Sequence, residues 1–425
     1  MRSIASLIVL VAASLSATPV FGPQVNGSDF AVTLFTSGLS FPQSIQQLPD
    51  NSIVVQTSPG FSAGSLLRFA DTDFDGIADG PGASIYTAPT NQGPLTQLVQ
   101  ANGYLIQGNY GAHSIVILQP GATPASQLTE VARMEFGYPG ALWWHDTIGL
   151  AVRPTPGQPG SFDLIFNVGS QFDNIASIDS VSVANLISGT LNPDSLYMVT
   201  LNLSGATPTA SNLRQVASGI RNVFGMGFDE SGNFWFSENA IDGSPFPPQA
   251  EELNRIFLDT LNKLQAGDPN TAVPNFGFPT CFPDYFTGIA ASPGCTEPIV
   301  AFTPLTDDFN NFFYSQGATQ IAFAPADFPA PYNHGIFIAF AGNPPGSRNP
   351  LIFYNLDTGL YEHFLLGGTG SVRQTGLLST NNALFISDFG TGEVFQITAA
   401  TPEPSTLALA ALALAGLALA RRRSK

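Results

Sequence analysis

Short runs that alternate between apolar and polar residues, each closed by a turn rich in Asp, Asn, Gly or Pro, recur along the chain from Phe30 onward. The clearest case lies within Gly219–Asn239, where Gly225–Phe228 and Phe234–Ser237 flank a turn at residues 229–233. Alternation buries one face of each strand, and Gly-Asn supplies a tight reversal, so this stretch predicts a β-hairpin.

The same unit, an apolar strand, a polar turn and a second apolar strand, returns through the body of the chain. Further examples are residues 44–55, Gly149–Val152 with Leu164–Asn167, Gln320–Phe323 with Gly335–Ile338, and Gly376–Leu378 with Ala383–Ser387. No single unit is large enough to bury its own faces, and repeated small antiparallel sheets are typical of a radial array. We therefore predict an all-β fold, a β-propeller with six blades favoured over five or seven.

Composition agrees with many short strands. The 425 residues are 44% hydrophobic and only 11% charged, with 42 glycines, 34 prolines and 34 phenylalanines. This balance supports a large core in one or two domains and tight turns, and it disfavours long amphipathic helices. Residues Asp259–Gly267 are expected to form a short helical or irregular insertion.

The formal net charge of −17 comes from 14 basic and 31 acidic residues. Such a chain repels phosphate backbones, and its basic cluster is confined to the extreme C-terminus, so nucleic acid is excluded as a partner. The acidity suits an exported protein or one that binds calcium, although it also serves simply to keep the surface solvated.

The first 22 residues predict a secretory signal peptide. An early Arg precedes an apolar run, Ile4–Val11, and small residues follow up to Gly22. A membrane anchor is the alternative, but the run is short for a bilayer. Residues 23–400 are then expected to form the propeller.

Composition changes abruptly after Ile397. Pro402-Glu403-Pro404 is followed by an Ala/Leu-rich run, Leu407–Ala420, and by a cationic end. Residues 401–425 closely resemble the PEP-CTERM sorting signal of Gram-negative bacteria. The resemblance implies processing by an exosortase, transient membrane association through a C-terminal helix, and delivery to the cell surface or the extracellular polysaccharide matrix. An ordinary C-terminal anchor would instead leave the domain membrane-bound and facing the periplasm.

A calcium-binding loop is predicted from four aspartates. Asp71, Asp73, Asp75 and Asp79 occupy positions 1, 3, 5 and 9 of the loop. Gly76 takes position 6, where a sharp turn wraps oxygen ligands around a hard cation. Gly82 stands at position 12, where an EF-hand has a bidentate Glu. A solvated Asp-rich turn is the alternative.

Two positions are candidates for proton or ligand chemistry. His145 is one of only 4 histidines, and imidazole is the side chain best suited to take a proton near neutral pH. Arg221-Asn222 places a planar donor fork beside an amide just ahead of a predicted strand, where side chains can contact a ligand. A structural histidine beside Asp146 is the alternative for His145.

The only cysteines are Cys281 and Cys295. In an exported protein, two cysteines that flank a Pro/Gly-rich loop predict a disulfide, whereas a zinc site needs more ligands. Aromatic residues nearby either line a pocket or, as we favour, pack a long loop: Phe276, Phe278, Phe282, Tyr285 and Phe286.

From Phe30 to Thr398 the chain resembles the glucose/sorbosone dehydrogenase family, six-bladed propellers of which several use pyrroloquinoline quinone (PQQ) and calcium. Four segments carry the resemblance in the family's order: His145 with Gly149–Val152, Val168–Ser170 and Asp173-Asn174; Gly219–Asn222; Glu252–Ile256; and Asn275–Pro279. The resemblance implies that His145 takes the substrate proton and that Glu252 is a calcium ligand. It also implies that Arg221, Asn222 and Arg373 contact the cofactor.

Two functions from different classes follow. The first is an exported PQQ-dependent dehydrogenase that oxidises a sugar or aldose-like substrate by hydride transfer. The alternative is a non-catalytic propeller that binds glycans or proteins of the extracellular matrix, because propeller faces often serve as binding platforms. A calcium-dependent hydrolase is a third class, for which Glu252 is the only candidate ligand.

Overall fold

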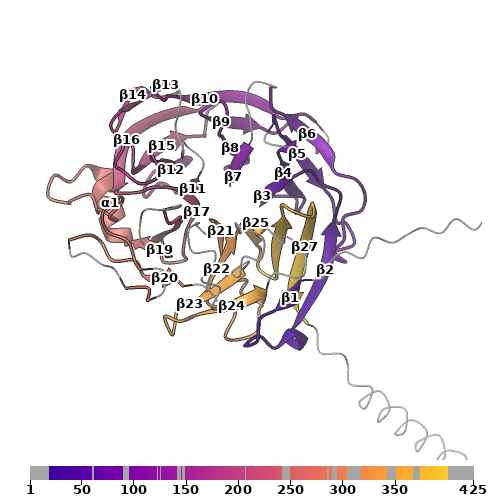
Figure 1. The fold of residues 1–425 in the computed structure, drawn as a ribbon. Coiled ribbons are helices and arrows are strands. Elements are labelled where there is room, and N and C mark those ends of the chain that lie inside the picture. Colours follow the sequence, from indigo (N-terminus) through magenta and orange to yellow (C-terminus); the bar gives the residue numbers. More distant parts are fainter. Residues whose placement is uncertain are drawn as a thin grey trace, which may run out of the picture.

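The computed structural model describes residues 19–59, 62–89, 95–121, 123–124, 126–140, 145, 149–205, 207–241, 249–284, 287–289, 294–303, 317–341, 351–366 and 374–400. Nearly all of them lie in strands and the turns between strands (Figure 1). The α-helix of this described part, α1, spans Leu258–Ala266, and a short 3-10 helix, η1, spans Gly27–Asp29. The insertion expected near residues 259–267 is therefore helical.

Six antiparallel sheets stand around a central axis, which confirms a six-bladed propeller (Figure 1). Blade 1 holds β3 (Pro42–Gln47), β4 (Ile53–Thr57), β5 (Ser65–Phe69) and β6 (Ala83–Thr87). Blade 2 holds β7 (Leu95–Ala101), β8 (Tyr104–Asn109), β9 (Ser114–Gln119) and β10 (Thr129–Gly137), with β13 (Val181–Asn185) and β14 (Gly189–Leu191) at its outer edge. Blade 3 holds β11 (Leu150–Pro154), β12 (Ser161–Val168), β15 (Ser195–Asn202) and β16 (Thr209–Ser218).

The other three blades follow in chain order. Blade 4 holds β17 (Val223–Phe228), β18 (Phe234–Glu238), β19 (Glu251–Ile256) and β20 (Val300–Phe302). Blade 5 holds β21 (Ala318–Phe323), β22 (Gly335–Phe340), β23 (Leu351–Asn355) and β24 (Tyr361–Leu366), with β1 (Val20–Phe21) at its edge. Blade 6 holds β25 (Gln374–Ser379), β26 (Ala383–Asp388) and β27 (Glu393–Ala399), completed by β2 (Phe30–Thr36).

The ring is closed by strands from both ends of the body. β2 pairs with β27 in antiparallel register, with Phe30 opposite Ala399. The N-terminal strand thus supplies the outer edge of the last blade. β1 is added in the same way to β24, with Val20 opposite Leu366. The signal peptide expected from the sequence ends at Gly22, one residue after β1. Cleavage there would remove β1, so the mature protein keeps this strand only if cleavage occurs before Val20.

The innermost strands, β3, β7, β11, β17, β21 and β25, begin on the same face of the ring, which we call the top face. Gln320 Nε2 donates to Ser44 Oγ at 2.7 Å, and Leu98 N donates to the same oxygen at 3.2 Å. The starts of β21, β3 and β7 therefore meet. Likewise, a Cβ on Gly225 of β17 would lie 2.1 Å from the backbone oxygen of Thr319 in β21. The second strand of each blade ends on this face, and the third strand begins there. We call the opposite side of the ring the bottom face.

Each blade buries both of its faces between its neighbours. In β4, Val54 packs with Leu105 of blade 2, and Val55 packs with Phe385 of blade 6. The second strands are consequently apolar almost throughout, rather than on one face alone. Alternation in the sequence predicts one buried face per strand; burial of the other follows from the stacking of blades around the axis.

Candidate functional site

The best-defined polar site lies on the top face between blades 3 and 4. His145 precedes β11, Asp173 lies in the loop after β12, and Arg221 lies in the turn between β16 and β17. Gly219 makes this turn possible, because its φ is +66° and a Cβ there would lie 2.1 Å from Asn275 Oδ1. Three segments far apart in the sequence thus bring their side chains to one place.

His145, Asp173 and Arg221 form one connected group of charged and ionisable side chains. His145 is 8% exposed, and its Nε2 lies 3.8 Å from Asp173 Oδ1. Arg221 is 1% exposed; it donates to the Asp173 carboxylate and, at 3.0 Å, to the Asp173 backbone oxygen. Burial alone would raise the pKa of Asp173, but the hydrogen bonds and charges of His145 and Arg221 outweigh it and hold this pKa below its usual value. Asp173 is therefore an ionised partner that can stabilise a protonated imidazole.

The guanidinium of Arg221 makes further contacts within the protein. Its Nη1 donates to Asn239 O at 3.4 Å. The backbone N of Arg221 donates to Glu238 Oε1 at 2.6 Å. The sequence predicts Arg221 as a ligand contact, whereas the contacts in the structure make it a link that holds Asp173 in place. Asp146 and Arg373, the other residues considered for this site, lie outside the described residues.

Blade 4 contributes three buried glutamates, Glu238, Glu251 and Glu252, and Glu238 contacts Arg221 directly. Glu238 at the end of β18 stands directly opposite Glu252 of β19, and Glu251 precedes Glu252. Asn254 Nδ2 donates to Glu252 Oε2 at 3.0 Å. Burial, and then the charges of Glu251 and Glu297, raise the pKa of Glu252 to about 8. Burial and the charge of Glu252 also raise the pKa of Glu238 well above its ordinary value.

Several oxygen atoms beside these glutamates are buried without a hydrogen-bond donor: Glu238 Oε2, Asn222 Oδ1, Asn239 Oδ1 and Asn254 Oδ1. Leaving such acceptors unpartnered is costly, and carboxylate and amide oxygens are the ligands that Ca²⁺ prefers. The set could therefore hold a hard cation. The sequence singles out Asn222 and Glu252 but not Glu238, although a glutamate at the end of the apolar run Phe234–Ser237 is a signal of a buried charge.

A disulfide joins Cys281 to Cys295, as the sequence predicts for an exported protein. The segment just before it supports the turn that carries Arg221, because Phe276 N and Phe278 N each donate at 2.9 Å to backbone oxygens of that turn. Both phenylalanine side chains are buried. For these two rings, packing is the alternative observed, whereas Tyr285 and Phe286 of the same prediction lie outside the described residues.

The Asp-rich loop between β5 and β6 brings three of its four aspartates together. One carboxylate oxygen from each of Asp71, Asp73 and Asp79 lies within 4.8 Å of the other two. Asp75 instead accepts a backbone N–H two residues further on, at 2.8 Å. Gly76 N donates to Asp71 Oδ2 at 3.2 Å, whereas Asp71 Oδ1 is buried without a hydrogen-bond partner. Burial and the charges of Asp75 and Asp73 raise the pKa of Asp71.

Comparison with known proteins identifies the C-terminal segment. Residues 400–423 match the PEP-CTERM protein-sorting motif, which indicates export and anchoring through the C-terminus. No curated protein matches the chain in sequence. Within the part of the chain that the structure describes, no helix is long and apolar enough to cross a membrane.

Solved structures share the propeller. The chain is similar to a Trichoderma reesei carbohydrate-active enzyme of family AA12, at 15% identity and a TM-score of 0.57, over 90% of this chain and 98% of that one. It is also similar to the holo PQQ domain of pyranose dehydrogenase from Coprinopsis cinerea (14%, 0.57, 90% and 98%) and to PQQ-bound aldose sugar dehydrogenase from Streptomyces coelicolor (15%, 0.53, 87% and 98%). At such identities the likeness establishes the fold alone. The chain is thus a six-bladed β-propeller with the architecture of PQQ-bound sugar dehydrogenases, followed by a PEP-CTERM sorting motif.

Proposed function

We propose that the protein is an exported, PQQ-dependent dehydrogenase that oxidises a sugar or aldose-like substrate. The observation that carries the proposal is the contact chain from His145 through Asp173 to Arg221 on the top face. It supplies a proton acceptor beside a carboxylate that stays ionised, which the oxidation of an alcohol carbon requires. The fold shared with PQQ-bound sugar dehydrogenases supports this reading.

Each residue of the contact chain has its own role. The imidazole of His145 takes the proton of the substrate hydroxyl, and Asp173 stabilises the positive charge that then forms on the ring. Arg221 does not touch reacting atoms in this scheme. It is a positioning residue, because its hydrogen bonds to the carboxylate and backbone oxygen of Asp173 fix that partner.

The residues near His145, Asp173 and Arg221 fit a quinone that binds together with calcium. PQQ is a tricarboxylate, so it needs cations beside it. The buried, unpartnered oxygens of Glu238 and Asn222, with Glu252, would hold Ca²⁺. The cation would then offset the negative charge of both the glutamates and the PQQ carboxylates. Asn222 and Arg373 are the proposed contacts to the quinone, whereas Arg221, which the resemblance also implies as a contact, is bonded to Asp173. When bound, the quinone supplies the hydride-accepting chemistry that side chains lack.

The test is a titration of the full chain with PQQ, with and without Ca²⁺, followed by a dye-reduction assay over a panel of sugars. We expect calcium-dependent binding, and a turnover that falls about 10²–10⁴-fold in His145→Ala, the usual contribution of a general base. Asp173→Asn should lower kcat with little change in PQQ affinity. His334→Ala, an exposed histidine at the bottom face, is the matched control. A wild-type chain that binds no PQQ would reject the proposal.

A second candidate is a non-catalytic propeller that binds glycans or proteins of the extracellular matrix. It is favoured by the contacts of Arg221, since a guanidinium already bonded to Asp173 and to backbone oxygens has little capacity left for a cofactor. The net charge of −17 also works against a tricarboxylate. Retention on a glycan array, with neither PQQ binding nor turnover, would favour this candidate over the first.

We further propose that the loop from Asp71 to Asp79 binds calcium. The convergence of Asp71, Asp73 and Asp79 supports this, whereas Asp75, the fourth ligand expected from the sequence, accepts a hydrogen bond from Ile77 N instead. Asp71→Asn should lower the calcium bound per chain, measured by elemental analysis after dialysis, by one equivalent. Asp357→Asn, a change at an exposed carboxylate, should leave it unchanged. Equal calcium contents in wild type and Asp71→Asn would contradict this site.

The sorting motif supports delivery to the cell surface or the extracellular matrix after an exosortase processes the C-terminus. Without processing, we expect a membrane-anchored domain that faces the periplasm. Fractionation of cells that express the wild type or a Pro402→Ala, Pro404→Ala variant distinguishes the two states. A variant that reaches the surface as efficiently as the wild type would count against the sorting route.

A further inference from the structure

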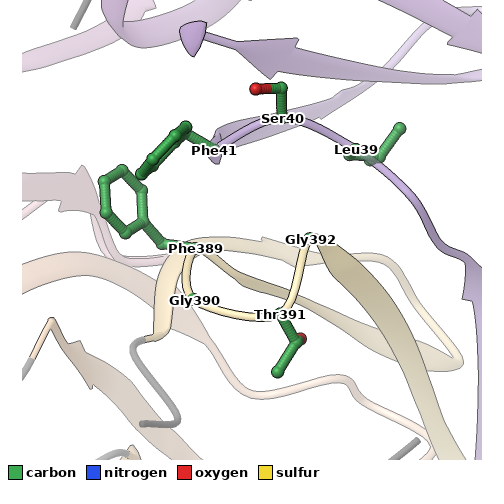
Figure 2. A pocket seen from close by; sticks show the side chains of 7 residues that line it. All are labelled: Leu39, Ser40, Phe41, Phe389, Gly390, Thr391 and Gly392. Carbon is green, nitrogen blue, oxygen red and sulfur yellow. The ribbon is translucent and has the colours of Figure 1, made fainter. Parts of the chain in front are cut away.

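A pocket opens on the top face between blades 6 and 1 (Figure 2). His145 and Arg221 instead lie between blades 3 and 4. Its volume is about 260 Å³. It lies between Leu39–Phe41, which lead into β3, and Phe389–Gly392, which join β26 to β27. Because β3 begins and β26 ends on the top face, the pocket and the candidate active site lie on the same side of the ring.

The backbone around the pocket is held in place by its own hydrogen bonds. Asp388, which is buried, accepts from Gly390 N at 2.8 Å and from Thr391 N at 3.0 Å. Leu39 N donates to Gly392 O at 2.9 Å and so joins the two walls. Gly392 has a φ of +75°, and a Cβ there would lie 2.2 Å from Leu39 O, so this close approach requires glycine.

Two aromatic rings form one end of the pocket. The ring centroids of Phe41 and Phe389 are 4.6 Å apart with an interplanar angle of 63°, and Figure 2 shows the rings side by side. Phe41 has a φ of +48°, which is unusual for a bulky side chain and stands directly before Pro42. Such a conformation persists only where the surroundings impose it, and it is concentrated at binding sites. Here it accompanies the contact between the two rings.

We propose that this pocket is a subsite for one ring of a neutral polysaccharide or oligosaccharide. Flat aromatic surface suits the C–H face of a sugar ring, and the exposed polar residues Ser40 and Thr391 belong to the two walls. The volume is below the roughly 300–1,000 Å³ of sites for drug-sized ligands, so it fits a single ring with the rest of the polymer outside.

The charge of the protein selects among sugars. None of the described residues that line the pocket is charged, and a chain with a net charge of −17 repels uronic acids and sulfated sugars. The subsite therefore favours neutral rings. It rests on the proposed sugar-oxidising function and extends it, because an ancillary ring site on the same face makes the substrate an oligomer rather than a free monosaccharide.

The test measures oligosaccharide binding to the full chain in the absence of PQQ. Isothermal titration with cellohexaose, mannohexaose and maltohexaose is compared in wild type, Phe389→Ala and Phe389→Tyr, with hexagalacturonic acid as the anionic comparison. We expect a neutral hexasaccharide to bind, Phe389→Ala to raise its Kd about tenfold or more, and Phe389→Tyr to retain binding. Phe257→Ala truncates an exposed ring after β19, at the bottom face, and should leave the Kd unchanged.

The outcomes separate this subsite from the proposed function. If the wild type binds none of the neutral hexasaccharides, or if folded Phe389→Ala binds them as tightly as the wild type, the subsite is rejected even when sugars are oxidised. Preference for hexagalacturonic acid rejects it too. If binding is lost in Phe389→Ala while no sugar is oxidised by the wild type, the subsite stands and the dehydrogenase falls. Should Phe389→Ala fail to fold, Phe389→Leu decides, because loss of the aromatic face with most of the side-chain volume kept should weaken binding several-fold.

Discussion

The buried glutamates of blade 4 make the stability of the calcium-free protein depend on pH. Burial, with the charges of Glu251 and Glu297, raises the pKa of Glu252 from 4.5 to about 8. Between these values the carboxyl holds a proton in the folded chain but not in the unfolded one. Because the folded state then binds more protons, the free energy of unfolding falls as pH rises through this window.

The size of this loss of unfolding free energy follows from the pKa values of Glu252 in the folded and unfolded chain. Glu252 is 2% exposed, so solvent screening is small. Between pH 6.5 and about 8 its carboxyl goes from almost fully to half protonated in the folded chain, which at 1.36 kcal/mol per pH unit removes roughly 2 kcal/mol of unfolding free energy. Glu238 acts in the same direction. His363 acts in the opposite direction, because burial lowers its pKa to about 4, but only below its ordinary value of 6.5.

The assay is thermal unfolding of the full chain, stripped of calcium, at several pH values above 6.5. At about 2 °C per kcal/mol for a large domain, we expect Tm to fall by roughly 3–4 °C by pH 8. Added Ca²⁺ should restore Tm most strongly at the highest pH, since the cation pairs with ionised carboxylates. Glu252→Gln should reduce the slope, whereas Glu230→Gln, an exposed control, should keep it. A wild-type Tm that is flat over this range would refute the reasoning.

Three further outcomes follow from particular contacts. Arg221→Lys should lower kcat and Tm, because an ammonium group cannot reproduce the planar pair of bonds to a carboxylate and a backbone oxygen; an unchanged kcat would argue against the positioning role. Replacing Cys281 and Cys295 with Ser opens a loop with a sequence separation of 14 and should cost about 3 kcal/mol, checked by urea unfolding beside the intact wild type. Gly225→Ala should destabilise the protein by about 1–3 kcal/mol or more, because its Cβ would lie 2.1 Å from a backbone oxygen of β21, whereas Gly80→Ala, in open space, should be neutral.

Much of the ring could be predicted because each inner hairpin carries a local signal. The runs Gly225–Phe228 and Phe234–Ser237 lie within β17 and β18, and the other four expected pairs likewise form the first two strands of their blades. The same reasoning could also have predicted the hairpin formed by β7 and β8. Its turn is Asn102-Gly103, with φ values of +48° and +82°, the dipeptide that tight hairpins prefer.

Other features depend on contacts that no local pattern encodes. After β12 the chain crosses to the edge of blade 2, where Val181 of β13 pairs with Leu191 of β14, before it returns to blade 3. Asp173 could be noted in the sequence, but its role depends on Arg221, which is 48 residues away in the chain. Glu238 becomes a strongly perturbed carboxyl only because blade pairing places Glu252 opposite it.

The position of the sorting motif relative to the ring has a direct geometric consequence. β27 starts on the top face at Glu393 and runs to the bottom face at Ala399, where Ala400 N donates to Asp29 O at 2.8 Å. The motif matches from residue 400 onward, so it follows the last ring-closing strand without a spacer. Attachment through the C-terminus therefore starts from the bottom face. The candidate active site at His145 and the aromatic pocket lie on the opposite face, away from the point of attachment.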